Sequence, residues 1–437
     1  MQVISDLRAL WPLTGFRRLF AVRLVSQASD GMFQVGLATL FFFSPENAST
    51  ATGVAAAFAV LLLPFTVVGP WAGVLLDRWR RRQVLLYGNL VRVALTVVIA
   101  AVMLTSGVGP AVYVLALAAL SVNRFLLAAL SASLPRVVDG PLLLTANSLT
   151  PTLGAASAGV GGALGFALGL LLPAGRVRDA VSLLVAAAVM ACASALATRL
   201  APDQLGPDER TPTSRVRAAL GELARGLVAG ARYLVARRTP AYALGIMALH
   251  RFCYGAVFIA SILISRNLLS DPADVEAGLA TFGSVLAASA VGFALAVVLT
   301  PVLSPRVGPH VWVVLCLLLA VVSQLVLVVT VSLPALLGAG AALGLAAQGA
   351  KIAVDTIVQR DTADAYRGRA FSLYDVLYNA AFVGAAALAA VALPDTGWSP
   401  ALFAALAVVY LAGALAFARG PRTPVPLAAP PVVGVDA

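Results

Sequence analysis

The feature that most constrains this chain is a series of apolar segments, each about 20 residues or longer, separated by shorter polar stretches. About 20 apolar residues in a helix cross the hydrocarbon core of a membrane, and a helix satisfies its own backbone polar groups there. We therefore expect twelve membrane-spanning helices. The expected helices cover residues 16–43, 52–76, 84–105, 110–134, 142–172, 181–200, 240–264, 277–302, 311–331, 333–358, 370–393 and 400–418.

The composition agrees with an all-α polytopic membrane protein. Hydrophobic residues make up 61% of the 437 positions and charged residues 11%, with a mean hydropathy of +0.95, well outside the range of soluble domains. The net charge of +11 could suggest nucleic acid as a partner. The charge lies mostly between the apolar segments, however, so we expect the lipid bilayer as the partner and no nucleic acid.

The basic residues orient the expected spans. If the spans alternate, 22 of the 30 Lys and Arg residues fall on one side, three fall in the opposite loops and five lie within spans. Lys and Arg beside membrane spans are retained on the cytoplasmic side. We therefore predict a multi-pass protein of the cell membrane with both termini in the cytoplasm.

A polar linker divides the chain into two halves. We predict an N-terminal six-helix bundle at 1–200, a cytoplasmic linker at 201–238, a C-terminal six-helix bundle at 239–419 and a disordered Pro-rich tail at 420–437. Within the linker, apolar and charged residues fall on opposite faces of a helix, which predicts a helix lying on anionic lipid. A partner-binding helix is the alternative. The apolar face holds Val216, Leu220, Leu223, Leu227 and Leu234, and the charged face Arg215, Glu222, Arg225 and Arg232.

The two halves share residues at a constant offset of 224 positions. Gly31 matches Gly255, and Arg136 matches Arg360, each at the same place in the expected topology. Parallel repeats joined by a long cytoplasmic linker are typical of transporters whose two bundles rock around a midplane site. Chance similarity between apolar helices is the alternative.

The stretch GVLLDRWRRR, residues 73–82, resembles the loop between the second and third spans of the major facilitator superfamily. Gly73, Asp77, Arg78, Arg81 and Arg82 match that loop's pattern, whereas Arg80 stands where a second glycine is usual. The resemblance implies twelve helices in two pseudo-symmetric six-helix bundles that work by alternating access. Loops after the fourth and tenth spans look like those of the drug-exporter branch.

The same resemblance implies a cytoplasmic gate. In that family the loop aspartate, here Asp77, faces the start of the eleventh helix and helps to lock the inward gate; topogenic charge alone is the alternative. The implied gate residues are Gly73, Asp77, Arg78, Arg81, Arg367 and Arg369. The segment GVGG at 159–162 is similar to the exporters' antiporter motif, although small residues for close helix packing are the favoured explanation.

Ionisable residues lie in the first, fourth, seventh and tenth spans, which by resemblance line the central cavity. Such residues are costly in a membrane and are functional candidates by default. Asp30 lies about 18 Å along its helix from Arg18, near the bilayer midplane. With Gln27 and Gln34 on its face, it suits a proton or a cationic substrate. The alternative is a structural salt bridge to Arg92 or Arg124.

The other cavity candidates include basic residues. Lys351 and Asp355 are one helical turn apart and could neutralise each other, or Lys351 could meet an anionic substrate while Asp355 takes part in coupling. Arg124 and Arg251 could hold a carboxylate or phosphate, with buried structural pairing as the alternative.

No motif indicates catalysis or a nucleotide-driven pump. Lys351 stands in Gly-Ala-Lys-Ile, which lacks the Ser or Thr of a phosphate-binding loop, and we find no metal-ligand or nucleophile motif. We therefore expect no enzyme activity and no cofactor. The expected function is proton-coupled export of a small amphipathic molecule or drug by a monomer. A facilitator or importer of lipids or metabolites, or a sensor or scaffold without flux, remains open.

Overall fold

The protein is described here by a computed structural model, which covers residues 9–38, 40–41, 50, 52–55, 57, 76, 79–138, 142–173, 175–206 and 216–423. These residues form helices and connecting loops, and no strand occurs among them. Ten of the described helices are long and apolar enough to cross a membrane. The expectation of an all-α polytopic membrane protein is confirmed.

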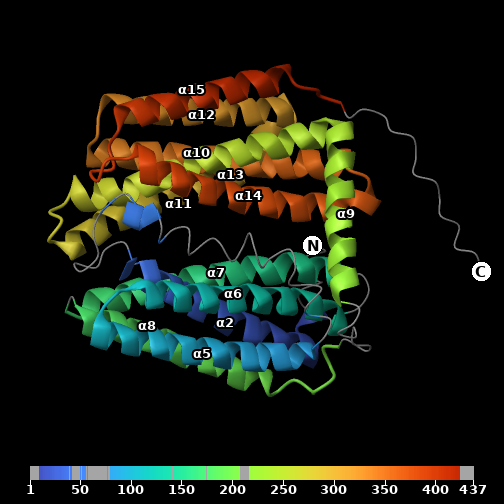
Figure 1. Ribbon diagram of the computed structural model, residues 1–437. Helices are drawn as coiled ribbons and strands as arrows, with labels where there is room; N and C mark the ends of the chain where they lie inside the picture. The colour runs from blue at the N-terminus through green and yellow to red at the C-terminus, as the bar shows by residue number, and fades with distance from the viewer. Residues whose placement is uncertain are drawn as a thin grey trace, which may run out of the picture. The chain divides into compact units, whose positions relative to one another are not determined.

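The chain divides into two compact units, which are described separately. The first comprises Met1–Gly221 with Arg266–Leu279. In it, α2 lies against α7 and α8, while α5 lies against α6 and α8 (Figure 1). The expected span at 52–76 lies almost entirely outside the described residues. The helices of this unit are α2 (Thr14–Ala38), α5 (Arg81–Ser106), α6 (Pro110–Ser133), the 3-10 turn η3 (Leu134–Arg136), α7 (Leu142–Leu171) and α8 (Arg176–Ala197).

The second unit comprises Glu222–Ser265 with Ala280–Ala437. In it, α12 packs against both α13 and α15, and from Glu222 onward α9 runs across the ends of the spanning helices (Figure 1). Residues 216–221, 266–267 and 275–279 at helix ends belong to the first unit; apart from these, the helices of the second unit are α9 (Val216–Arg237), α10 (Thr239–Asn267), α11 (Val275–Val307), α12 (Pro309–Val329), α13 (Leu333–Asp361), α14 (Asp364–Ala392) and α15 (Pro400–Arg419).

Two helices begin clearly earlier than the apolar pattern predicts. Helix α8 begins at Arg176, five residues before the expected span, and α14 begins at Asp364, six residues before. The first four N–H groups of a helix have no partner within it and are served by water or polar side chains. Polar first turns are therefore stable outside the hydrocarbon, and hydropathy alone underestimates the length of the helix.

Small residues allow the helices of each unit to approach closely. A Cβ on Gly161 of α7 would collide with the carbonyl oxygen of Ala28 on α2, whereas a Cβ on Gly159 would meet open space. At Gly161 of the GVGG segment, close packing is therefore the function that the structure shows. In the same way, a Cβ on Gly31 would collide with the backbone of Ala158.

The two units repeat that contact in register. A Cβ on Gly255 of α10 would meet the Phe382 side chain on α14. Residues 255 and 382 lie 224 positions after residues 31 and 158, so equivalent positions are in contact in the two units. The offset read from the sequence therefore relates not only residue types but also a helix contact.

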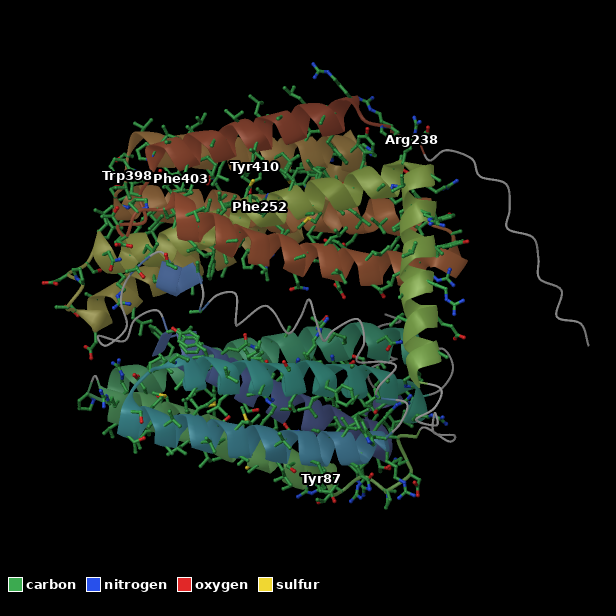
Figure 2. The ribbon with its side chains drawn as sticks, in the orientation of Figure 1. Tyr87, Arg238, Phe252, Trp398, Phe403 and Tyr410 are labelled. Atoms are coloured by element: carbon green, nitrogen blue, oxygen red, sulfur yellow. The ribbon has the colours of Figure 1, made fainter. Side chains whose placement is uncertain are left out.

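Burial separates an inner from an outer face on the helices. Tyr410 and Phe403 point into the second unit and are buried, whereas Tyr87 stands on the outside of α5 with 58% of its surface exposed (Figure 2). Many exposed side chains on the spanning helices are aliphatic, including Val97, Val98 and others along α11, α12 and α15. Outward aliphatic side chains suit a hydrocarbon surrounding and would be unfavourable in water.

Candidate functional site

Asp30 of α2 forms a buried ion pair with Arg92 of α5. The Asp30 Oδ1 atom lies 2.8 Å from Arg92 Nη2, and the two side chains are 8% and 0% exposed. The sequence left three roles for Asp30 open, namely proton site, cation site and structural salt bridge. The structure selects Arg92 as the salt-bridge partner and brings the pair inside the first unit.

The two members of this pair are not equally satisfied. Gln34 Nε2 donates to the second Asp30 oxygen at 2.6 Å, and the Asn123 side chain of α6 lies beside that carboxylate. On the other side, Arg92 Nε and Nη1 are buried without a hydrogen-bond partner in the described residues. The carboxylate is thus well held, while the guanidinium has spare donors.

Gln27 lies one turn before Asp30 but faces a different neighbour. Its Oε1 atom is buried without a hydrogen bond in the described residues and occupies the space where Gly154 of α7 would carry a side chain. The expected polar stripe of Gln27, Asp30 and Gln34 is therefore split between α7 and the ion pair. One turn from that pair, Ser26 Oγ donates to Asn89 Oδ1 at 3.2 Å and continues the polar seam between α2 and α5.

In the second unit, the guanidinium of Arg251 on α10 lies among aromatic rings. Its Cζ atom is 3.8 Å from the ring centroid of Phe382, 4.2 Å from that of Tyr378 and 5.3 Å from that of Tyr254. Its Nε atom is buried without a hydrogen-bond partner, and no carboxylate pairs with it in the part of the chain that the structure describes. For Arg251, the alternative of buried structural pairing with an acid is not observed there.

Lys351 and Asp355 of α13 form the pair that their spacing predicts. Lys351 Nζ lies 2.7 Å from Asp355 Oδ2, and both side chains are partly exposed. The ammonium also lies 5.7 Å from the ring centroid of Tyr374 on α14. The Tyr374 hydroxyl also lies beside the Asp355 carboxylate, which it can reach as a hydrogen-bond donor.

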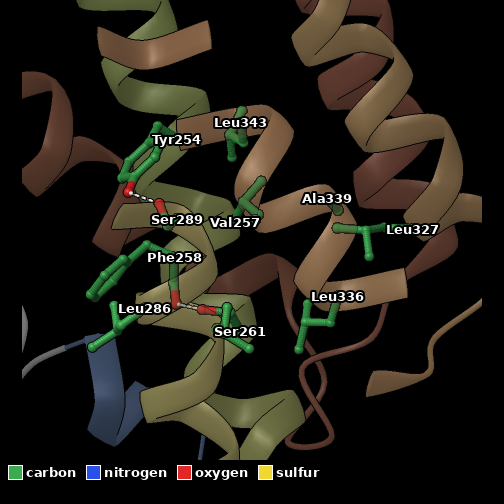
Figure 3. Close-up of a pocket in the computed structure, with 12 residues that line it drawn as sticks. Tyr254, Val257, Phe258, Ser261, Leu286, Ser289, Leu327, Leu336, Ala339 and Leu343 are labelled. Carbon is green, nitrogen blue, oxygen red and sulfur yellow. Dashed lines mark hydrogen bonds between the residues drawn. The ribbon is translucent and has the colours of Figure 1, made fainter. Parts of the chain in front are cut away.

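A small pocket lies between α10, α11, α12 and α13, with Tyr254 in its lining (Figure 3). The Tyr254 hydroxyl faces Ser289 Oγ across it at 3.4 Å, and the rest of the lining is largely apolar. Its volume of about 30 Å³ has room for about two water molecules. Substrate sites are typically several hundred Å³ in volume, so this pocket by itself does not hold a substrate.

Some of the remaining candidate residues lie within the described residues and others lie outside them. Arg124 lies on α6 in the first unit and is not a partner of Asp30 in the ion pair described above. Gly73, Asp77 and Arg78 lie outside the described residues, so the gate stays a prediction. Arg367 and Arg369 lie in the first turns of α14.

Two arginines of the 73–82 stretch, Arg81 and Arg82, bind carbonyl groups at helix ends of the first unit, whereas Arg80 pairs with Asp203. Arg81 Nη1 donates to the Ala132 carbonyl at 2.9 Å, near the end of α6, and Arg82 Nη2 donates to the Thr198 carbonyl at 3.2 Å, after α8. Positive charge is favourable at helix C-termini, where carbonyl groups lack partners. These side chains therefore hold helix ends of the first unit together.

Helix α9 docks on the loop between α13 and α14. The rings of Tyr233 and Tyr366 stack in parallel with centroids 4.0 Å apart, and the Tyr233 hydroxyl accepts a 3.1 Å hydrogen bond from the Ala363 backbone N–H. Leu234 on the apolar face is 3% exposed. The expectation that this face lies on lipid is wrong for Leu234, because the protein itself covers that residue.

Sequence reasoning missed the side chains that complete both charged sites. One of them is Asn123, although an amide in a spanning helix is unusual and was a usable signal. The rings around Arg251 come partly from α14, where Phe371, Tyr374, Tyr378 and Phe382 recur at helical spacing. That spacing was a usable signal for an aromatic face.

Comparison with known proteins agrees with this architecture. The family model of the Major Facilitator Superfamily matches residues 252–434. Two uncharacterized MFS-type transporters, from Mycobacterium bovis and Mycobacterium tuberculosis, are each 33% identical over 406 residues, covering 93% of this chain and 91% of theirs.

Solved structures of transporters share the fold. The nucleoside transporter NupG matches with a TM-score of 0.63 and 14% identity over 92% of this chain and 97% of its own. A mutant of the peptide transporter POT gives a TM-score of 0.68 and 15% identity over 91% of this chain and 93% of its own. From its fold and its relatives, this chain belongs to the major facilitator superfamily and is a multi-pass membrane transporter.

Proposed function

We propose that this transporter is a proton-coupled secondary exporter of small amphipathic molecules, of the drug and metabolite exporter-like branch. It would work by alternating access in the cell membrane as a monomer, with both termini in the cytoplasm. The observation that carries the coupling is the buried pair of Asp30 and Arg92, in which the carboxylate is well satisfied and the guanidinium is not.

A structural ion pair in a low-dielectric interior is stable when further hydrogen bonds satisfy both partners. Arg92 instead keeps two buried nitrogens without partners in the described residues. Its position is therefore favourable mainly while Asp30 is charged. Protonation of Asp30 would remove the counter-charge and favour a state in which water or another group reaches Arg92, and a conformational change that supplies such a group would be linked to proton binding.

The gate at the loop of residues 73–82 belongs to the same proposal. Asp77 would close the cytoplasmic side against the start of α14, with Gly73, Arg78, Arg81, Arg367 and Arg369 around it. Arg81 would hold its end of the loop through the helix-end carbonyl described above.

The test uses the full-length chain in liposomes with a pH gradient. The probes are naphthalene-2-sulfonate, a permanent anion, and (2-naphthylmethyl)trimethylammonium, a permanent cation, because both are fluorescent, amphipathic and poorly membrane-permeant. With an acidic lumen, a proton antiporter accumulates its probe inside, whatever the orientation of the protein in the vesicle. An Asp30→Asn variant should lose this accumulation.

Other results would support the remaining alternatives. Accumulation only with an alkaline lumen would indicate symport, and equilibration without accumulation would indicate a facilitator. Absence of flux for both probes, in vesicles that contain folded protein, would favour a sensor or scaffold.

A further inference from the structure

Arg251 carries a charge that the described protein does not neutralise. Its helix, α10, is one of the membrane-spanning helices, and a cation at that depth is costly without a partner or a water-filled cavity. Two other cations in spanning helices are neutralised by a carboxylate, since Arg92 pairs with Asp30 and Lys351 pairs with Asp355. Arg251 has no such acid in the described residues.

What surrounds Arg251 instead is aromatic. Phe382, Tyr378 and Tyr254 lie within 3.8–5.3 Å of its guanidinium carbon. Ring faces attract a guanidinium and hold it in place, and this group is hydrated weakly enough to stack on them. Rings leave the charge uncompensated, however, and they do not satisfy N–H donors as an oxygen acceptor does. The arrangement positions a cation and keeps it available to an anion.

The aromatic face continues along α14 away from Arg251. Tyr378 packs edge-on against Tyr374 with centroids 5.9 Å apart, and Tyr374 packs in the same manner against Phe371 at 6.3 Å. Tyr374 in turn lies beside Lys351, whose charge is already matched by Asp355. One side of this face therefore has an unmatched cation, and the other has a neutral pair.

We propose that Arg251 and the aromatic face of α14 form a subsite for an amphipathic anion. The anionic head, a carboxylate, sulfonate or phosphate monoester, would bind the guanidinium, and a flat apolar body would lie against the half-buried Tyr378 beside it. This substrate class rests on the proposed function as a transporter of amphipathic molecules. It selects anions among them, since the matched Lys351 and Asp355 pair adds no net charge.

Binding to the purified full-length chain in neutral detergent tests this without requiring transport. The ligands are naphthalene-2-sulfonate, the trimethylammonium cation of the same ring, neutral 2-naphthylmethanol and inorganic sulfate as the head without the body. Titration calorimetry gives the affinities. We expect the wild type to bind the sulfonate at least about tenfold more tightly than each of the other three, because a charge-assisted contact and a stacked ring act together.

Variants locate the subsite. Arg251→Gln should weaken sulfonate binding about tenfold or more, and Arg251→Lys should restore part of it, because lysine keeps the charge but lacks the planar fork. Tyr378→Leu should weaken the sulfonate while leaving the weak binding of inorganic sulfate unchanged. Arg306→Gln, which removes one exposed charge at the end of α11, is the matched control and should bind like the wild type.

Every result bears on the proposal. Equal sulfonate affinity in Arg251→Gln and wild type, tighter binding of the cation, or no preference for the sulfonate would overturn it. If Arg251→Gln does not fold, Arg251→Lys and Tyr378→Leu still decide the matter, since both must bind the sulfonate more weakly than Arg306→Gln. Sulfonate binding without any flux would contradict the proposed function but not this subsite. Flux of the cation alone would contradict this subsite but not the proposed function.

Discussion

Neutralising Asp30 should destabilise the first unit far more than its small change in shape suggests. Asp30→Asn keeps the size of the side chain but leaves Arg92, which is 0% exposed, without a counter-charge. Breaking a buried pair by removing one partner costs about 3–5 kcal/mol, whereas replacing both partners with apolar residues is often neutral or stabilising. We therefore expect Asp30→Asn to cost about 3 kcal/mol and Asp30→Asn with Arg92→Met to recover most of that loss.

The assay is a double-mutant cycle on the full-length chain, with unfolding in a mixed-micelle denaturant titration followed by circular dichroism. The matched control is Ser26→Ala, which removes a neutral hydrogen bond to Asn89 from the same seam between α2 and α5. Loss of such a bond costs about 1 kcal/mol. A cost of Asp30→Asn no greater than that of Ser26→Ala, or a double variant as unstable as Asp30→Asn, would refute the expected role of the charge.

Three further perturbations have expected outcomes. In a thermal unfolding measurement in detergent, Gly161→Ala should lower the stability of the protein by about 2 kcal/mol or more, because the new Cβ meets a backbone carbonyl. In the same measurement Gly159→Ala, whose Cβ enters open space, should be neutral or stabilising by about 0.5–1 kcal/mol. Tyr233→Ala should release α9 from the loop before α14 and make the linker a faster target in limited trypsin digestion, with the exposed Val235→Ala as the unaffected control. Asp77→Asn should increase the labelling of cysteines introduced on the cytoplasmic side of the cavity. An unchanged labelling pattern would contradict the proposed gate.

Hydropathy predicted the spanning helices because the membrane imposes a length of about 20 apolar residues and a helical backbone. The same pattern placed the starts of α8 and α14 several residues too late, since polar first turns are stable in water and carry no apolar signal. The offset of 224 residues gave the repeat, and the contacts of Gly31 and Gly255 show that it holds at the level of packing.

The charged sites were only partly predictable. The spacing of Lys351 and Asp355 sets their contact within one helix, so the sequence was sufficient. The choice of Arg92 over Arg124 as the partner of Asp30 depends on how α5 and α6 are rotated against α2, and that rotation follows from side-chain packing over the whole unit. Likewise, no local sequence pattern predicts that the Arg251 guanidinium contacts aromatic rings and not a carboxylate.

The central claim is that protonation at Asp30 couples alternating access to the proton gradient. Comparing two kinds of transport in the Asp30→Asn protein tests it. Counterflow exchange of labelled for unlabelled naphthalene-2-sulfonate needs only alternating access, whereas accumulation against a gradient needs coupling to protons. We predict that the variant retains exchange but loses accumulation driven by an acidic lumen. Accumulation at the wild-type level in this variant would contradict the proposed coupling.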